Sequence, residues 1–283
     1  MWLYYSIFAM TKLVILLQPP IAIESLWSLT NEQFLPVCKK LFQWQLQHNP
    51  VYKEWVTLMV KDEEMPEEMN KIPFLPISFF KTHDVFVGDQ PNTLFESSGT
   101  TQDVVSKHWV SNTAIYEQSF LQCFQLFYGA PTDYCVIGLL PSYLERKHSS
   151  LVYMVNELIK QSNHPDSGFY LDDFASLDKL LKKLELQNQK VWLMGVSFAL
   201  IDFSAAFPQQ LNNTIVIETG GMKGRKQELT KTELHHLLAA QLGVQKINSE
   251  YGMTELLSQA YSHGDGIFTC PPWMKVLVSD EDD

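Results

Sequence analysis

The stretch YCVIGLL, residues 134–140, decides the fold that the sequence predicts. Its residues are all apolar or small, which is typical of a short strand buried on both faces of a sheet. Apolar residues then recur at helical spacing from Leu151 to Ile159, so a helix is expected to follow the strand. A buried strand that leads into a helix is the first half of a β-α-β unit.

The same pattern recurs along the second half of the chain. Further strands are expected at 191–194 (VWLM), 214–217 (TIVI) and 245–248, with helices at 198–206 and after a capping box at Thr230 and Glu233. The fold class expected is therefore α/β, with mostly parallel sheets covered by helices. Ligands of such sheets bind where strands end, which here is just after Leu140, Met194, Ile217 and Asn248.

The first half of the chain begins with a predicted helix. Thr30 and Gln33 read as its capping box, and apolar spacing continues to His48. The segment 61–75, with repeated Glu and Pro, is expected to be an exposed connector. No Gly-, Ser- or Pro-rich linker divides the 283 residues, so one continuous domain over 26–283 is expected after an apolar extension at 1–25.

Charge and cysteine content exclude several classes of function. The chain has 21 Lys and Arg against 32 Asp and Glu, formally −11, and no basic stripe, so nucleic acid is not expected as a partner. The four cysteines lack metal-ligand spacing and indicate reduced thiols in a cytoplasmic protein. Lys12 interrupts the apolar first 17 residues, which therefore favour a non-native extension or a buried arm over a membrane anchor or signal.

Three short motifs that follow apolar segments carry the chemistry. FESSGTTQ at 95–102 offers hydroxyls and close backbone amides of the kind that bind polyphosphate, without the spacing of a Walker A loop. ETGGMKGR at 218–225 offers paired glycines against which a planar ligand can lie. NSEYGMTEL at 248–256 offers a ring, a hydroxyl and a carboxylate suited to Mg²⁺. Each motif taken alone is also compatible with an ordinary turn.

Taken together, SSGTT at 97–101 and YGMTE at 251–255 resemble the adenylate-forming superfamily of acyl-CoA ligases, luciferases and peptide-synthetase adenylation domains. The surrounding FESSGTT, LLPSYLERKHSSLVYM and ETGGMKGR look most like the acyl-protein synthetases of LuxE type, which supply fatty acyl groups to the bacterial luciferase reductase. The resemblance covers roughly residues 25 to 275. It implies that residues 26–283 form the large AMP-binding domain, incomplete at its carboxyl end.

The resemblance also implies a ligase with ATP and Mg²⁺ as cofactors. A carboxylic acid, expected to be a fatty acid, would be activated as an acyl-adenylate with release of pyrophosphate, and the acyl group would pass to a thiol of a cofactor or partner protein. The ATP phosphates would be held by Ser97, Ser98, Gly99, Thr100 and Thr101, and the adenine slot would be lined by Gly220, Gly221 and Met222. Tyr251 would stack on adenine, Thr254 would touch the α-phosphate, Glu255 would hold Mg²⁺, and His148 would take an acyl-pocket or gating position unless it is a structural histidine.

The sequence departs from the superfamily in two places. QDVVSK follows the hydroxyl loop at 102–107 where relatives have glycine and a proline–lysine pair, and Lys107 is the lysine that could serve instead. Relatives continue past Asp283 with a ribose-binding aspartate, a hinge and a lid bearing a catalytic lysine, and the LuxE type has its acyl-accepting cysteine there. Two alternatives therefore stay open: a catalytically incomplete nucleotide- or acyl-binding domain, and a structural α/β interaction domain whose motifs are chance turns.

Overall fold

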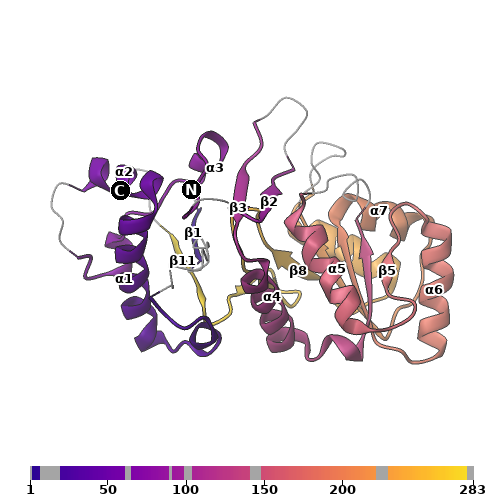
Figure 1. Ribbon diagram of the computed structural model, residues 1–283. Coiled ribbons are helices and arrows are strands. Elements are labelled where there is room, and N and C mark those ends of the chain that lie inside the picture. The colour runs from indigo at the N-terminus through magenta and orange to yellow at the C-terminus, as the bar shows by residue number, and fades with distance from the viewer. Residues whose placement is uncertain are drawn as a thin grey trace.

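The computed structural model describes residues 2–6, 20–60, 65–88, 91–98, 104–140, 148–220 and 229–278, with only the backbone described for 2–6. Figure 1 shows a sheet with flanking helices at one end of the molecule and helices α1 (Asn31–His48) and α2 (Pro50–Met59) at the other. Among the described residues, no helix combines the length and the apolar character needed to cross a membrane.

The largest sheet among the described residues has seven strands, in the order β10-β9-β8-β7-β6-β4-β5. Strands β4 to β8 pair in parallel, whereas β9 and β10 join the edge antiparallel. The strands are β4 (Cys135–Leu139), β5 (Gly168–Phe169), β6 (Val191–Val196), β7 (Thr214–Thr219), β8 (Asn248–Tyr251), β9 (Ala260–Ser262) and β10 (Phe268–Thr269). The prediction of an α/β fold with a mostly parallel sheet is confirmed. Because β5 and β6 lie on opposite sides of β4, the strand order reverses there, and ligands of open sheets bind at such a point.

Helices cover both faces of this sheet. Two glycines show which helix lies on which face, because a Cβ on Gly138 would meet Val155 of α5, whereas one on Gly195 would meet Leu200 of α7. Gly138 pairs with Met194, the residue before Gly195, and successive strand residues point to opposite faces. One face therefore carries α4 (Thr113–Tyr128) and α5 (Ser150–Ser162), and the other carries α6 (Phe174–Leu186), α7 (Ser197–Ala206) and α8 (Lys231–Leu242).

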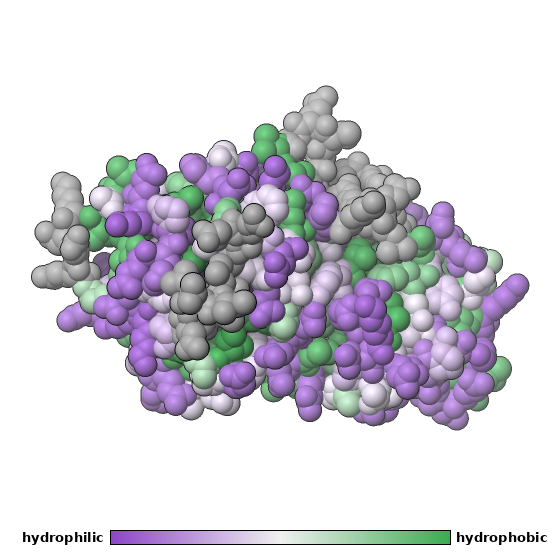
Figure 2. Space-filling model, in the orientation of Figure 1, coloured by the Kyte–Doolittle hydropathy of each residue, from purple (hydrophilic) through white to green (hydrophobic). Residues whose placement is uncertain are grey.

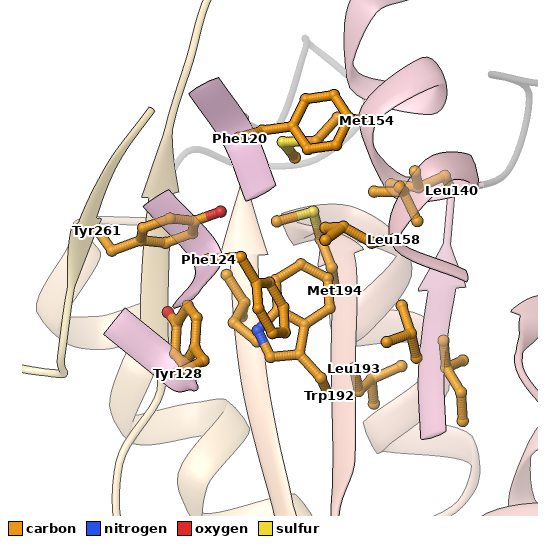
Figure 3. Close-up of a cluster of buried hydrophobic side chains, with 14 of the residues drawn as sticks. Phe120, Phe124, Tyr128, Leu140, Met154, Leu158, Trp192, Leu193, Met194 and Tyr261 are labelled. Atoms are coloured by element: carbon orange, nitrogen blue, oxygen red, sulfur yellow. The ribbon is translucent and has the colours of Figure 1, made fainter. Parts of the chain in front are cut away.

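Aromatic side chains form the core on the α4 face (Figure 3). Phe124 and Tyr128 of α4 contact the ring of Trp192 on β6, at centroid distances of 5.3 and 6.0 Å. Tyr261 of β9 contacts Tyr128 edge-to-face at 5.1 Å. Burying each large side chain of this kind stabilises the fold by about 1.5–3 kcal/mol. This packing joins α4 to β6 and β9 on one face of the sheet.

The remaining elements form smaller units. Strands β2 (Thr93–Glu96) and β3 (Lys107–Val110) make an antiparallel pair, and β1 (Trp2–Ser6) pairs antiparallel with β11 (Met274–Val278). The described part of the predicted 1–25 extension thus includes a strand that pairs near the other end of the chain. Short helices are α3 (Phe79–Thr82) and the 3-10 segments η1 (Ile23–Ser28), η2 (Met69–Lys71) and η3 (Pro131–Asp133).

The segment 61–75, expected to be an exposed connector, is exposed at Glu67, Glu68, Asn70 and Lys71, but it is not exposed throughout its described part. Residues 61–64 lie outside the described residues, but Ile72 is buried against Tyr52 and Phe42 in a small cluster under α1 and α2. The Tyr52 hydroxyl donates to the Pro73 carbonyl at 2.9 Å, and the Trp55 indole N–H donates to the Phe74 carbonyl at 3.1 Å. Hydrogen bonds to its backbone carbonyls therefore hold the end of this segment against α2, although its composition is polar.

The helix starts at Thr30 and Thr230 are confirmed, each with its capping box. The strand ends predicted at Met194, Ile217 and Asn248 are too early. Strand β7 continues through Glu218 and Thr219, and the strand expected at 245–248 is wrong because β8 begins at Asn248 and ends at Tyr251. Hydropathy alone misses these residues because their polar side chains are satisfied by neighbouring strands: Glu218 lies opposite Ser249, and Thr219 lies opposite Glu250.

Figure 2 shows mainly hydrophilic residues on this face of the molecule, with smaller hydrophobic areas between them. The large apolar side chains that are most exposed come from separate elements, among them Leu58 of α2, Leu186 of α6 and Ile267 beside β10. Scattered exposure of this kind is ordinary for a folded chain. In open sheets of this kind, ligands bind at the carboxyl edge of the parallel strands.

Candidate functional site

The predicted site residues fall into two groups. Gly99, Thr100, Thr101, Gly221 and Met222 lie outside the described residues. The described members are Ser97 and Ser98 after β2, His148 before α5, Gly220 after β7, and Tyr251, Thr254 and Glu255 at and after β8. Gly220 and Tyr251 stand at the ends of neighbouring strands, because Thr219 and Glu250 are register partners.

Ser97 closes the base of the connection between β2 and β3. Its backbone N–H donates to the Ser106 carbonyl at 3.0 Å, and its Oγ accepts from the Ser106 N–H at 2.9 Å. The side chain thereby continues the β2–β3 pairing by one step beyond Glu96 and Lys107. The position of Ser97, where the hydroxyl-rich motif begins, is therefore fixed by two hydrogen bonds to Ser106.

His108 links this hairpin to the YGMTE segment. Its Nδ1 lies 2.9 Å from the Thr254 carbonyl oxygen, which can only accept, so Nδ1 carries the proton and donates it. The ring is buried and lies edge-to-face with Phe80 at 5.4 Å. Burial lowers the pKa of His108 to about 4, although the bond to Thr254 raises it, so the imidazole is neutral near pH 7. The hairpin that carries Ser97 thus contacts the YGMTE turn through a residue that the sequence did not single out.

His148 lies along β2. Its Nδ1 donates to the Leu94 carbonyl at 3.1 Å, and its own carbonyl accepts from the Glu96 N–H at 2.8 Å. The side chain is exposed. These bonds place the exposed ring beside the strand that leads into Ser97, and they show that the residue also has a structural role.

The YGMTE segment forms a tight turn after β8. The Leu256 N–H donates to the Met253 carbonyl at 3.1 Å, and the half-buried Thr254 and Glu255 stand at the turn. The Tyr251 ring packs edge-to-face on Phe268 at 6.1 Å. The turn therefore presents a hydroxyl and a carboxylate together.

A buried carboxylate, Glu218, lies at the end of β7 on the face covered by α7 and α8. The Ser249 hydroxyl donates to its Oε1 at 2.6 Å, the Lys231 ammonium also donates to Oε1, and the Ser197 hydroxyl donates to Oε2 at 3.1 Å. His235 Nε2 lies 3.4 Å from Oε1 and 3.2 Å from the Ser249 oxygen. Desolvation raises the pKa of Glu218, but hydrogen bonds from His235, Lys231 and Ser249 and the Lys231 charge outweigh it and hold the pKa below its ordinary value.

A second buried carboxylate, Glu250, lies on the opposite face of the sheet. It accepts a hydrogen bond from the Thr219 hydroxyl, and Tyr261 is its cross-strand neighbour on β9. Desolvation raises the pKa of Glu250 to about 7, the Thr219 bond opposes that rise, and the nearby Glu218 charge adds to it. Gly252 leaves room for it, since a Cβ there would come within 2.5 Å of Oε1.

Sequence reasoning assigned no role to Glu218, Glu250 or His108. Both acids stand inside the quoted motifs, one directly after an expected strand and the other just after the next. A charged residue at the end of a buried parallel strand must find partners or lose its charge. That position was the signal that could have identified the two carboxylates, whereas His108 gives no comparable signal.

Ser197 invites comparison with a hydrolase nucleophile, because Gly195, Ser197 and Ala199 have the spacing of a nucleophile elbow between a strand and a helix. That turn needs a strained backbone at the serine. Within the described chain, the non-glycine residues with positive φ are Asn163 and Asn188. Ser197 is 1% exposed and donates to a carboxylate rather than to a histidine. The geometry does not fit a serine hydrolase.

The chemistry of the described side chains bears on whether a nucleotide and Mg²⁺ could bind here. Within the described chain, no group of three or more His, Cys, Asp or Glu side chains could hold a metal ion. Mg²⁺ beside a nucleotide commonly takes one or two carboxylates and completes its shell with phosphate oxygens and water. Glu255, half-buried with the Thr254 hydroxyl next to it, fits that role. Gly220, with φ of 72°, takes a left-handed conformation that favours glycine at the edge where a planar base would lie.

No protein-family model matches the chain, and no curated protein matches it.

Proposed function

We propose that the protein is an adenylate-forming enzyme of the acyl-protein synthetase type. It activates a carboxylic acid, most simply a fatty acid, with ATP, and passes the acyl group to a thiol. The observation that carries the proposal is the hydrogen bond from His108 to the Thr254 carbonyl. Through it the strand after the SSGTT motif contacts the YGMTE turn, as a nucleotide held by both motifs would require.

The first step joins the acid to the nucleotide. A carboxylate oxygen of the acid attacks the α-phosphorus of ATP, a new oxygen–phosphorus bond forms, and the bond to the oxygen bridging the β-phosphorus breaks, so pyrophosphate leaves. Positioning and charge neutralisation are the main contributions a protein makes to such a displacement. In the proposed site, Tyr251 stacks on the base, Ser97 and Ser98 face the phosphates and Thr254 donates to the α-phosphate. Mg²⁺ bound at Glu255 would supply neutralisation of the phosphate charge.

The second step needs a thiolate. Its sulfur attacks the acyl carbon, and AMP leaves with the electrons of the broken carbon–oxygen bond. Within this chain, burial raises the pKa of every cysteine thiol, to about 12 for Cys38 and about 11 for Cys135, and above the ordinary value for Cys123 and Cys270. A raised pKa makes a thiol a poor nucleophile at neutral pH. The acceptor in this proposal is therefore a thiol of a partner protein or cofactor.

The test measures pyrophosphate release from MgATP over a panel of fatty and aromatic acids. We expect release to depend on the acid and to fall at least about 100-fold in Glu255→Ala, because loss of a metal-holding group removes transition-state stabilisation of several kcal/mol. Glu54→Ala is the matched control, since Glu54 is an exposed carboxylate on α2, and it should keep wild-type activity. Acid-independent release, or equal activity in Glu255→Ala and wild type, contradicts the proposal. ATP binding without pyrophosphate release would favour a binding domain.

A further inference from the structure

Ser197 connects the buried Glu218 to the backbone of the proposed nucleotide edge. It is the first residue of α7, and its hydroxyl oxygen lies 3.1 Å from Glu218 Oε2 and 3.2 Å from the Gly220 carbonyl oxygen. The Gly220 carbonyl can only accept a hydrogen bond, and so can the Glu218 carboxylate when it is ionised. The serine has a single hydroxyl proton to donate to the two of them. The proton is therefore shared between the carboxylate and the backbone that follows β7.

Glu218 is held in place independently of Ser197. Its other oxygen, Oε1, accepts from Ser249 of β8 and from Lys231 at the start of α8, with His235 one turn further along that helix. The carboxylate is fully buried, whereas the Lys231 side chain is 50% exposed. A buried carboxylate with donors from two other elements, β8 and α8, is held in one orientation without Ser197. The far oxygen is thus a fixed acceptor for the Ser197 hydroxyl.

We propose that Ser197 and Glu218 are positioning residues that hold the Gly220 end of β7 in the orientation needed for nucleotide binding. The inference rests on the proposed function for its ligand, but the positioning itself is a property of the described contacts. Glu218 is linked to the residues on both sides of the β7–α8 connection. It accepts a hydrogen bond from Ser197, whose hydroxyl also lies near the Gly220 carbonyl, and it accepts one directly from Lys231. Neither residue need touch substrate.

Ser197→Ala tests this with little risk to folding, because it removes one hydroxyl and leaves Glu218 bound to Ser249, Lys231 and His235. The matched control is Ser204→Ala on the same helix. Ser204 is also fully buried, and its hydroxyl bonds to the Ile201 carbonyl and to Gln241 Oε1 at the far end of α7. The dissociation constant for MgATP, measured by calorimetry, should rise about threefold to tenfold in Ser197→Ala, the effect of losing one positioned hydrogen bond, and less than about twofold in Ser204→Ala.

Hydrogen–deuterium exchange without ligand gives a second readout. We expect the amides near Thr219 and Gly220 to exchange faster in Ser197→Ala than in Ser204→Ala, because the end of β7 opens locally more often. Equal MgATP affinity in the two variants, or equal exchange at these amides, overturns the inference. If wild-type protein binds no MgATP, the proposed function fails, and the exchange comparison alone then decides whether Ser197 and Glu218 position this edge.

Discussion

Glu250 and His108 are buried titratable residues whose effects on stability oppose each other. The folded protein keeps a proton on Glu250 up to about pH 7, whereas an unfolded glutamate loses it near 4.5, so stability falls as pH rises across that range. His108 is protonated only below about pH 4 when folded but below 6.5 when unfolded, so stability falls as pH drops from 6.5 to 4. Between pH 4.5 and 6.5 the two slopes cancel.

Single substitutions should expose each slope. Relative to wild type, Glu250→Gln should gain stability as pH rises from 4.5 to 7, and His108→Asn should gain stability as pH falls from 6.5 to 4, each by about 1.4 kcal/mol per pH unit. Asparagine can still donate to the Thr254 carbonyl, so contact is retained while the titration is lost. Urea denaturation at a series of pH values measures this. A variant whose pH dependence parallels that of wild type would show that its residue does not titrate as described.

At the scale of elements, β6 and α7 approach each other closely at Gly195. A Cβ on Gly195 would lie 2.7 Å from Leu200 Cγ and 3.3 Å from Leu139 Cβ, both of them buried. Gly195→Ala should therefore destabilise the fold by about 1–3 kcal/mol, because the buried leucine has little room to move. Gly168→Ala on β5 is the matched control, since a Cβ there meets nothing within 4 Å, and it should change stability by less than about 0.5 kcal/mol. Equal effects on the denaturation midpoint would contradict this account of the β6–α7 contact.

Elements were predictable where the signal is local. The helix starts at Thr30 and Thr230 follow from capping boxes that need only four consecutive residues. Strand ends were not predictable in the same way, because Ser249 and Glu250 belong to β8 through partners on β7. The Glu218 contacts join residues 13 to 31 positions away in sequence, and no local pattern specifies them. The sequence pattern therefore does not determine which distant residues form hydrogen bonds with a buried polar side chain.

At the scale of the whole molecule, the sheet and the β2–β3 hairpin bring distant motifs to one edge. Ser197, Gly220 and Tyr251 lie at the carboxyl ends of the parallel strands β6, β7 and β8. The hydrogen bond from His108 to the Thr254 carbonyl joins the β2–β3 hairpin to the turn after β8. The topology explains why three motifs in order along the chain could be expected to converge. The contact through His108 could not be predicted, because nothing near it in sequence distinguishes it from a core histidine.

The central claim is that this edge forms an acyl-adenylate, and mass spectrometry of the reaction products tests it most directly. The protein is incubated with MgATP and the acid that supports the most pyrophosphate release. We predict a product whose mass equals that of the acid plus AMP less water, present in wild type and absent in Glu255→Ala. Formation of ADP and phosphate, or of no acid–AMP conjugate with any acid tested, would contradict the account.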